Sequence, residues 1–349
     1  MIADVAQLVE HLICNQGVGS SNLSVGTIKT IILLISYSSL GGYKLKTFQN
    51  KVAVITGAGS GMGRYLALNL AQSGSDVVIC DINENALKET EELIKNYNIS
   101  CSSLTLDLRD KVNIDTLVEK TIKNHGKVDL LFNNAGVASP SSFLDMKESD
   151  WNWCNDINYN SLVYCTRAFL PYLIKDQETA LVNTSSIFGI ITTPNNTVYH
   201  ATKFAVRGFT ESLGTELKDK KIQVNSVYPG HIGTNIVLDA RFGKDILLTN
   251  GEYAKDSKGQ SLTVKEVGST FKESGMSPDK AAKIILKGVK KNKKRIFVGL
   301  DAKVMEIAQR ISPSHYVSII PILNLFIFPY FLKRIKMLRI FYSIMRSKR

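Results

Sequence analysis

Short apolar runs alternate with segments of helical periodicity between residue 51 and about residue 300. The apolar runs have the length of buried strands, and the segments between them repeat apolar positions at the spacing of a helix face. The predicted strands are Val52–Thr56, Asp76–Cys80, Leu104–Leu106, Val128–Phe132, Leu181–Asn183, Ile222–Val227 and Arg295–Val298. Such alternation is typical of βαβ units, so we predict an α/β fold with a doubly wound parallel sheet and helices on both faces.

The segments between the predicted strands contain the expected helices. A glycine-rich turn after the first strand leads into a helix that runs to about Ser73. The other helices are predicted at Glu84–Asn96, Val112–Asn124, Trp151–Ile174 and Thr197–Lys218. Asp239–Ser274 is polar and contains glycine, and we expect it to form a mobile insertion.

Residues 1–45 do not follow this pattern. Their apolar run Ile31–Ile35 is too short to span a bilayer, and the segment lacks the features of a secretory signal. Ala6–His11 and Gly19–Leu23 can be encoded by nucleotide sequences that resemble the D-arm and the T-loop of a transfer RNA gene. We therefore expect either a misannotated start, with translation beginning near Leu45 or Lys46, or a disordered leader.

Composition places the chain among globular proteins. Hydrophobic residues make up 44% and charged residues 21%, which argues against global disorder. The five cysteines form no CxxC pair and no Cys/His cluster with zinc spacing, so no metal site is predicted. Unpaired cysteines fit a cytoplasmic or cytosol-facing protein.

The net charge of +12 is concentrated at the C-terminal end. From Asp279 to Arg349 there are 17 Lys and Arg against 3 Asp and Glu, whereas the remaining residues have 26 against 28. A basic tail beside apolar residues fits an anionic membrane surface better than nucleic acid.

The C-terminal tail contains the uncharged run Val317–Leu332, which is shorter than a spanning helix requires. Basic residues interleaved with Ile, Leu, Phe and Met follow it. Two interpretations stay open: residues 316–349 form a peripheral anchor on the cytosolic face of a membrane, or the tail packs over the protein. An anchor would favour a lipophilic alcohol or ketone of steroid, retinoid or fatty-acyl type, because such substrates concentrate in membranes.

The turn Thr56–Gly63, TGAGSGMG, lies between a predicted strand and a predicted helix. Glycines there let the backbone turn tightly and approach a pyrophosphate, which rests on the positive end of the helix. A glycine turn alone is a weak signal, but its place in a βαβ unit strengthens it.

The second predicted strand is followed by Asp81, 18 residues after Gly63. A carboxylate there accepts hydrogen bonds from ribose hydroxyls and repels a 2′-phosphate. No basic residue follows Asp81 closely, and Ser60 precedes Gly61, so we predict NAD as the cofactor, with NADP as the alternative. Arg64 is a candidate phosphate contact, and a solvated turn residue is the alternative interpretation of Asp81.

Tyr199 and Lys203 are four residues apart, which places them on one face of a helix. Tyrosine, with a pKa of about 10, is a poor acid/base at neutral pH. A neighbouring Lys⁺, together with an oxidised nicotinamide, lowers that pKa by favouring the phenolate. Ser186 lies 13 residues before Tyr199, at the end of a predicted strand.

These motifs, in this order, resemble the short-chain dehydrogenase/reductase family. TGAGSGMG matches the family's TGxxxGxG, Asn133–Gly136 matches its NNAG, and Tyr199 with Lys203 matches its YxxxK. The resemblance implies the catalytic set Asn158, Ser186, Tyr199 and Lys203. It implies the cofactor-binding set Gly57, Ser60, Gly61, Met62, Gly63, Asp81, Asp107, Leu108, Asn134, Ala135, Gly136, Tyr199, Lys203, Pro229, Gly230, Ile232 and Thr234.

The resemblance also implies a function: an oxidoreductase of Rossmann fold that transfers a hydride between NAD(P) and a secondary alcohol or ketone. Tyr199 would be the general acid/base, and Ser186 would stabilise the substrate oxygen. Lys203 would lower the pKa of Tyr199 and hold the nicotinamide ribose, and Asn158 would bend its helix and hold a water.

The resemblance gives some further residues minor roles. Asp107 would contact the adenine ring, and the Pro229–Thr234 segment would hold the nicotinamide carboxamide. His200 points to a different face of the helix from Tyr199, and His231 is a candidate pocket residue. Trp151 and Trp153 lie on the helix that commonly forms a dimer interface in this family, so we expect a homodimer or homotetramer.

The predicted organisation is a leader over residues 1–45, a single catalytic domain over residues 46–300, and a C-terminal helical extension over residues 301–349. The alternative to an enzyme is an NAD-binding regulatory or scaffold protein on the same fold. The complete set of four catalytic residue types argues against it. A membrane-associated structural protein would leave the glycine turn unexplained.

Overall fold

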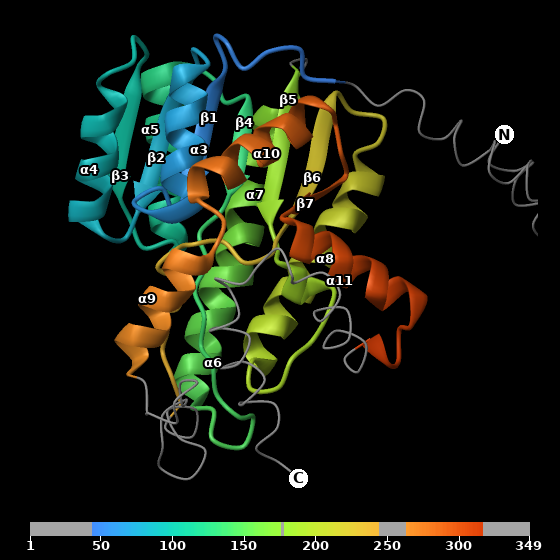
Figure 1. Cartoon of the computed structure of the whole chain (residues 1–349). Helices are drawn as coiled ribbons and strands as arrows, with labels where there is room; N and C mark the ends of the chain where they lie inside the picture. The colour runs from blue at the N-terminus through green and yellow to red at the C-terminus, as the bar shows by residue number, and fades with distance from the viewer. Residues whose placement is uncertain (1–43, 176–177, 244–262, 317–349) are drawn as a thin grey trace, which may run out of the picture. The chain divides into compact units, whose positions relative to one another are not determined.

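Seven parallel strands form one sheet in the order β3-β2-β1-β4-β5-β6-β7 (Figure 1). The strands are β1 (Val52–Thr56), β2 (Asp76–Asp81), β3 (Cys101–Thr105), β4 (Leu130–Asn133), β5 (Thr179–Thr184), β6 (Ile222–Pro229) and β7 (Arg295–Val298). The computed structural model describes residues 44–175, 178–243 and 263–316, all within the unit Tyr43–Arg349. The predicted leader, apart from its last two residues, and residues 317–349 lie outside the described residues. The predicted doubly wound parallel sheet is confirmed.

Helices connect the strands and cover both faces of the sheet. They are α3 (Gly61–Gln72), α4 (Glu84–Ile94), α5 (Lys111–His125), α6 (Glu148–Asn155), α7 (Ser161–Leu173), α8 (Thr197–Glu216), α9 (Val264–Ser274), α10 (Pro278–Lys290) and α11 (Leu300–Ile311). A π-helical turn, η1 (Asp156–Asn160), joins α6 to α7, and a 3₁₀ turn, η2 (Ile187–Gly189), follows β5. None of the helices in the described part of the chain is long and apolar enough to cross a membrane.

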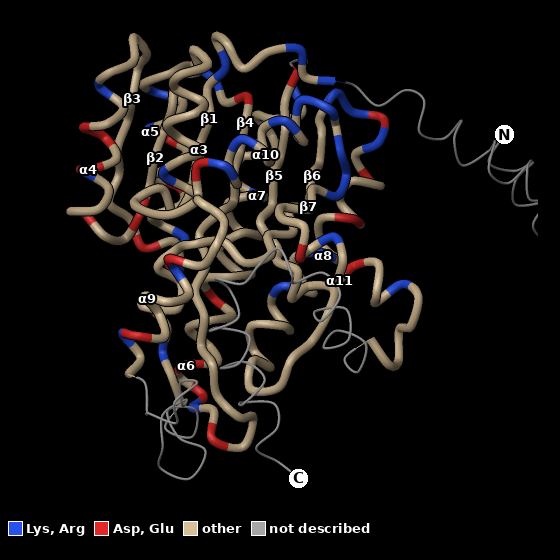
Figure 2. Tube along the Cα trace, viewed as in Figure 1, with Lys and Arg blue, Asp and Glu red and all other residues tan. Residues whose placement is uncertain are grey.

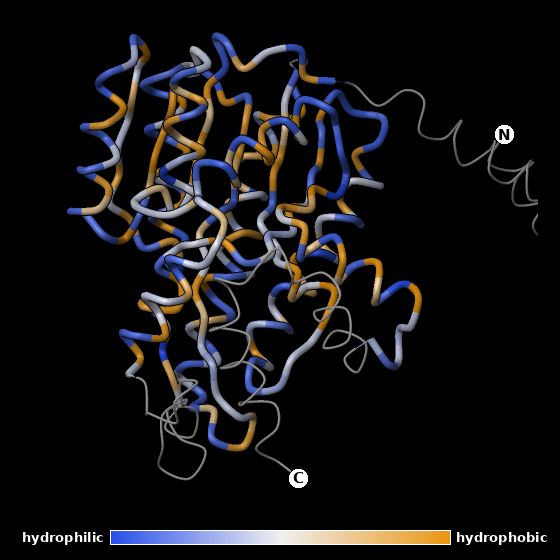
Figure 3. The backbone as a smooth tube through the Cα atoms, in the orientation of Figure 1, coloured by the Kyte–Doolittle hydropathy of each residue, from blue (hydrophilic) through white to orange (hydrophobic). Residues whose placement is uncertain are grey.

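The apolar residues of each strand alternate between two hydrophobic cores. Ala53 and Ile55 of β1 pack with α3, α4 and α10, whereas Val52 and Val54 pack with residues of α5 and α7. Because both faces are covered, the central strands are mostly apolar, as the orange colour along them shows in Figure 3. This double burial explains why β1 has the bounds predicted from its apolar run. The edge strand β7, in which only alternate residues are buried, also has its predicted bounds.

The edge strand β3 differs from its prediction because only one of its residues is fully buried. Its sequence CSSLT is mostly polar and half-buried, so the apolar run predicted at Leu104–Leu106 covers only its last part. The true register pairs Val77 with Cys101 and Asp81 with Thr105. In an edge strand with a mostly polar sequence such as β3, apolar runs are a weak guide to strand bounds.

The expectation of a mobile insertion over Asp239–Ser274 is wrong for its last part. Val264–Ser274 forms α9, which begins with a capping box in which the Thr263 side chain and the Glu266 side chain exchange hydrogen bonds with each other's backbone N–H. The Thr-x-x-Glu pattern is a known helix-start signal and was sufficient to predict this helix. Residues 244–262 of the expected insertion lie outside the described residues.

Part of the C-terminal basicity lies on the body of the protein. Lysines cluster in the turn before β6 and in the turn before β7, two strands that pair side by side (Figure 2). The exposed members are Lys218, Lys220, Lys221, Lys290, Lys291, Lys293 and Lys294. This cluster lies at the amino ends of the strands, and the residues predicted to be functional gather at the carboxyl ends.

Candidate functional site

The strand order reverses between β1 and β4, since β2 and β3 continue on one side of β1 and β5, β6 and β7 follow on the other side of β4. At such a switch point the loops from neighbouring strands diverge at the carboxyl ends and leave a crevice in which doubly wound proteins bind ligands. The glycine turn follows β1, and Asn134–Gly136 follows β4. The structure therefore places two of the predicted motifs at the same point of the sheet.

The glycines of this turn are packed so closely that a side chain at Gly57 or Gly63 would not fit. A Cβ on Gly57 would lie 2.8 Å from the Cα atom of Ala135, and a Cβ on Gly63 would lie 2.7 Å from the side-chain nitrogen of Asn134. Gly57 and Gly61 also have φ angles of +64° and +52°, which favour glycine. The turn and the segment after β4 thus form one closely packed unit.

The third predicted motif, the Pro229–Thr234 segment after β6, reaches the same unit. A Cβ on Gly61 would lie 3.0 Å from the Thr234 side chain. Ile232 is buried and pairs with Met276 in an isolated bridge, and Pro229 pairs with Val298 of β7. The predicted cofactor residues of β1, β4 and β6 are therefore brought together.

The amino end of α3 is suited to an anion. The Ser60 side chain precedes the helix but makes no capping hydrogen bond, and the first turn contains no acidic residue. The backbone N–H groups of Gly61, Met62 and Gly63 stand at the positive end of the helix dipole. This arrangement fits a bound pyrophosphate.

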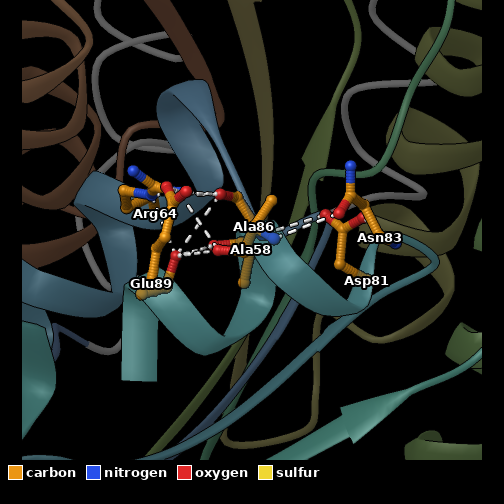
Figure 4. Close-up of polar contacts among 8 residues, drawn as sticks. Ala58, Arg64, Asp81, Asn83, Ala86 and Glu89 are labelled. Atoms are coloured by element: carbon orange, nitrogen blue, oxygen red, sulfur yellow. Dashed lines mark hydrogen bonds and ion pairs between the residues drawn. The ribbon is translucent and has the colours of Figure 1, made fainter. Parts of the chain in front are cut away.

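Asp81 ends β2 beside the glycine turn (Figure 4). Its Oδ2 accepts a hydrogen bond from the Gly59 backbone N–H at 2.9 Å, and its Oδ1 accepts one from the Asn83 N–H at 3.0 Å. These two bonds fix the carboxylate at the edge of the turn. The predicted partner of an adenosine ribose therefore lies beside the glycine turn.

Arg64 is engaged within the protein rather than aimed at a phosphate (Figure 4). Its Nε donates to the Gly59 carbonyl at 3.0 Å and to the Thr90 hydroxyl at 2.9 Å. Its Nη2 donates to the Ala86 carbonyl at 3.0 Å and pairs with Glu89 at 2.8 Å. The guanidinium joins the glycine turn to α4.

Asp107 and Leu108 follow the edge strand β3. The Asp107 carboxylate pairs with Arg109 at 2.6 Å, and this hydrogen bond lowers the pKa of Asp107. Leu108 packs against the core on the α5 and α7 side. The Leu106 N–H donates to the Asp81 carbonyl at 3.0 Å, which places this segment next to Asp81.

Tyr199, Lys203 and Ser186 converge after β5. Lys203 is buried on α8, and its Nζ donates to the Thr184 carbonyl at 3.1 Å and lies 5.6 Å from the centre of the Tyr199 ring. Ser186 caps η2 by accepting from the Phe188 N–H at 3.1 Å. A Cβ on Gly136 would lie 3.3 Å from the Lys203 Nζ, so the segment after β4 contacts the same group.

Burial dominates the acid–base properties of the pair. Burial raises the pKa of Tyr199 to about 12, and a hydrogen bond with the Ser186 hydroxyl acts in the opposite direction. Burial also lowers the pKa of Lys203 to about 8. In the chain by itself, the pKa of Tyr199 is therefore raised, whereas the sequence analysis expected Lys203 and oxidised nicotinamide together to lower it. The reason is that burial disfavours the charged phenolate more than the hydrogen bond with Ser186 favours it.

Asn158 lies in the π-helical turn η1, which interrupts the helix predicted over Trp151–Ile174. Its Oδ1 accepts from the Val137 N–H at 2.8 Å, and its Nδ2 donates to the Val137 carbonyl at 3.0 Å. Its Nδ2 also donates to the Thr202 hydroxyl at 3.2 Å, which in turn donates to the Tyr199 carbonyl. π-Helical turns are frequent at functional sites, and here the turn lets Asn158 join the segment after β4 to α8.

Two threonines were missed by the sequence analysis. The Thr56 hydroxyl accepts from the backbone N–H groups of Asn134 and Ala135 at 2.9 and 3.0 Å and so holds the two motifs together. Its place as first residue of the glycine turn was a signal for this role. Thr202, inside the Tyr199–Lys203 interval, had no signal in the sequence, because its partner Asn158 is distant along the chain.

His200 and His231 make hydrogen bonds with backbone groups of the protein. The His200 Nε2 accepts from the Thr193 N–H at 2.9 Å, and its Nδ1 contacts the Phe188 carbonyl at 3.0 Å. The ring is therefore neutral with the proton on Nδ1, since an N–H can only donate and a carbonyl can only accept. The His231 Nε2 donates to the Phe271 carbonyl of α9 at 2.8 Å.

The sequence was compared with those of known proteins and protein families. Residues 51–244 match the pattern of the family described as short chain dehydrogenase. The chain belongs to the short-chain dehydrogenase family. It is 34% identical over 280 residues to SadH of Mycobacterium tuberculosis, by its name an oxidoreductase, covering 78% of this chain and 94% of SadH. It is 35% identical over 186 residues to the 3-oxoacyl-(acyl-carrier-protein) reductase FabG of Thermotoga maritima, covering 53% of this chain and 76% of FabG.

A solved structure has the same fold as this short-chain dehydrogenase. It is a short chain dehydrogenase/reductase from Burkholderia phymatum in complex with NAD, with a TM-score of 0.67 and 24% identity. The match covers 76% of this chain and 95% of that protein. The fold therefore extends over nearly the whole of the relative.

The contacts of His200 predict a pH dependence of stability in this short-chain dehydrogenase. Burial lowers the pKa of His200 below its ordinary value of 6.5. The unfolded chain then binds a proton more readily, so the contribution of His200 to stability is complete above about pH 6.5 and is lost as the pH falls below it. We expect the native protein to lose more unfolding free energy between about pH 7.5 and pH 5.5 than His200→Gln does, measured by urea unfolding.

The exposed His315 provides the matched control. His315→Gln should keep the native pH dependence, because its ring has no buried site to lose. If the unfolding free energy of the native protein and of His200→Gln depended equally on pH, His200 would not be the buried neutral ring inferred here.

Proposed function

We propose that this chain is an NAD-dependent oxidoreductase that transfers a hydride between the nicotinamide and a secondary alcohol or ketone, with Tyr199 as general acid/base. The convergence of Tyr199, Lys203, Ser186 and Asn158 beside the glycine turn is the observation that carries this proposal. Four chemically distinct side chains from separate elements meet next to a site built for a pyrophosphate. A protein that only binds a dinucleotide has no need for them.

The residues present fit NAD. The uncapped amino end of α3 would hold the pyrophosphate, and Asp81 would accept from the ribose hydroxyls while its charge disfavours a 2′-phosphate. Arg64, which is engaged with α4, leaves no basic partner for such a phosphate at this turn. The Burkholderia phymatum relative also has NAD bound. NADP is the alternative cofactor.

When bound, oxidised nicotinamide supplies the hydride acceptor and a positive charge that favours the Tyr199 phenolate. Ser186 donates a hydrogen bond toward the substrate oxygen and also lowers the pKa of Tyr199. Tyr199 takes or gives the proton on that oxygen. Lys203, whose lowered pKa of about 8 still leaves it charged at neutral pH, adds positive charge at the ring.

More specifically, we propose that the alcohol or ketone substrate is lipophilic, of fatty-acyl, steroid or retinoid type. The loop after β4 presents Phe143 and Leu144 to solvent, with 66% and 96% of their surface exposed. This loop rises from the carboxyl end of the sheet, where Tyr199 lies, so its apolar side chains are available to an apolar substrate. The similarity to a 3-oxoacyl-(acyl-carrier-protein) reductase supports the acyl class.

We also propose that the enzyme is a homodimer or homotetramer. Its molecular mass in solution, measured by light scattering, tests this proposal. The proposal rests on the family resemblance of the helices around η1. Within the chain, Trp151 packs edge-on against Phe143, and Trp153 stacks with the Arg241 guanidinium at 4.0 Å.

Tyr199→Phe should abolish turnover while leaving NADH affinity nearly unchanged. The substitution removes the acid–base hydroxyl, which contributes about 10²–10⁴ to the rate of such reactions, and keeps the ring. NADH fluorescence with panels of alcohols and ketones, repeated with NADPH, first identifies a substrate for the native enzyme. The kcat and the NADH Kd are then compared, with Tyr172→Phe on α7 as the control. Retained turnover in Tyr199→Phe would refute the assigned role, and NADH binding without turnover of any substrate would support the regulatory alternative.

Asp81→Asn should lower the preference for NADH over NADPH on the order of tenfold or more. The amide keeps an oxygen acceptor for the Gly59 N–H but removes the negative charge, and like charges a few ångströms apart near a surface interact by a few kcal/mol. The measurement is kcat/KM for both cofactors. Glu84→Gln, an exposed acid at the start of α4, is the control and should leave the ratio as it is. An unchanged ratio in Asp81→Asn would show that Asp81 does not select the cofactor.

We propose that residues 316–349 attach the enzyme to the cytosolic face of a membrane. The tail lies largely outside the described residues, but α11 leads into it and carries an exposed apolar stripe of Leu300, Ile307 and Ile311. The native chain should sediment with phosphatidylserine-containing vesicles and much less with phosphatidylcholine vesicles, in a salt-sensitive manner. A chain that ends at Tyr316 should stay in the supernatant. Equal sedimentation of both chains would contradict the anchor.

A further inference from the structure

The loop Pro229–Thr234 is held at several points by residues from distant parts of the chain. The Gly230 N–H donates to the Val298 carbonyl at 2.9 Å, and the Gly233 N–H donates to the Met276 carbonyl at 2.9 Å. The His231 N–H is bound by a side chain: it donates to the Asp301 Oδ2 at 2.6 Å. Asp301 is the second residue of α11, so the last described helix of the chain contacts this loop.

The Asp301 carboxylate fits between two glycines. A Cβ on Gly230 would overlap the carboxylate, and so would a Cβ on Gly299, which has a φ angle of +111° and turns the chain from β7 into α11. A side chain at position 230 would therefore displace the carboxylate from the Gly230 backbone. A short hydrogen bond to an ionised acceptor is stronger than one between neutral groups.

Residues of α11 and the turn after it contact the other side of the site as well. Tyr316 follows α11, and its hydroxyl accepts from the Thr192 N–H at 2.9 Å and shares a hydrogen bond with the Thr192 hydroxyl at 2.8 Å. Thr192 lies between Ser186 and Tyr199 in the chain. Ala302, Ala308 and Tyr316 pack in one cluster with Ile187 and Tyr228. The segment is thus anchored by buried contacts near Ser186, which keeps Asp301 in place.

We propose that Asp301 is a positioning residue for cofactor binding, an inference that rests on the proposed function. By holding the His231 N–H, Asp301 sets the path of the loop that brings Thr234 against Gly61 of the glycine turn. It acts through the loop and does not itself contact the cofactor. Loss of its carboxylate removes the acceptor of the His231 N–H and loosens the loop at this residue, while Gly230 stays bound to Val298 and Gly233 to Met276.

The test compares Asp301→Ala, Asp301→Asn and Glu306→Gln. Asparagine keeps an oxygen acceptor for the His231 N–H, and Glu306 is a largely buried acid of the same helix that pairs with Arg310. NADH titration by fluorescence should give a Kd about tenfold or more higher for Asp301→Ala, the range expected for a lost hydrogen bond to a charged group. Asp301→Asn should recover most of this affinity, and Glu306→Gln should bind as the native protein does.

Hydrogen exchange of the peptide that contains residues 230–234 provides a readout independent of the cofactor. Exchange should be faster in Asp301→Ala than in the native protein and in Glu306→Gln. Unchanged exchange, or faster exchange with native NADH affinity in folded Asp301→Ala, would overturn the inference. Failure of the native protein to bind NADH would instead refute the proposed function, and the exchange data would still decide whether Asp301 holds the loop.

Discussion

The close approach of backbone at the carboxyl ends of β1 and β4 is the constraint on which the rest of the site depends. The Cα atom of Ala135 occupies the space where Gly57 would carry a side chain. The Thr56 hydroxyl joins the two segments by accepting from both of the N–H groups that follow β4. The strand order reverses at this point, where doubly wound proteins bind ligands in a crevice, and the amino end of α3 lies here together with the segments after β4 and β6.

Burial next to this crevice sets the chemistry that the chain offers. The same exclusion of water raises the pKa of Tyr199 and lowers that of Lys203, since it disfavours the charged form of each. The pair therefore favours a neutral phenol in the chain by itself. In the alcohol-oxidising direction of the proposed reaction Tyr199 has to accept a proton, and the positive charge of the oxidised nicotinamide would favour this step.

The site also depends on polar side chains that hold backbone segments in place. Asn158 pairs with both backbone groups of Val137, as a neighbouring strand would, and this contact is available because η1 interrupts the regular helix. His200 fixes the segment around Phe188 and Thr193 that precedes Tyr199. Asp301 does the same for the loop after β6. Each of these residues uses a polar side chain to hold a backbone segment that has no regular secondary structure.

Much of this protein could be predicted from its sequence alone, because the information is local. The apolar runs of β1, which is buried on both faces, and of the edge strand β7, which is buried at alternate residues, predicted the bounds of both strands. The order of the glycine turn, NNAG and YxxxK motifs indicated the family. The predictions for the edge strand β3 and the helix α9 were wrong, the first because β3 is mostly polar and the second because the Thr263–Glu266 capping box was not used as a helix signal. The tertiary structure alone decided the contacts between residues far apart in the chain: Thr202 with Asn158, Arg64 with α4, and Asp301 with His231. The sequence determined which residue types were available, and only folding determined which polar groups were buried against one another, because burial and close approach are properties of packing.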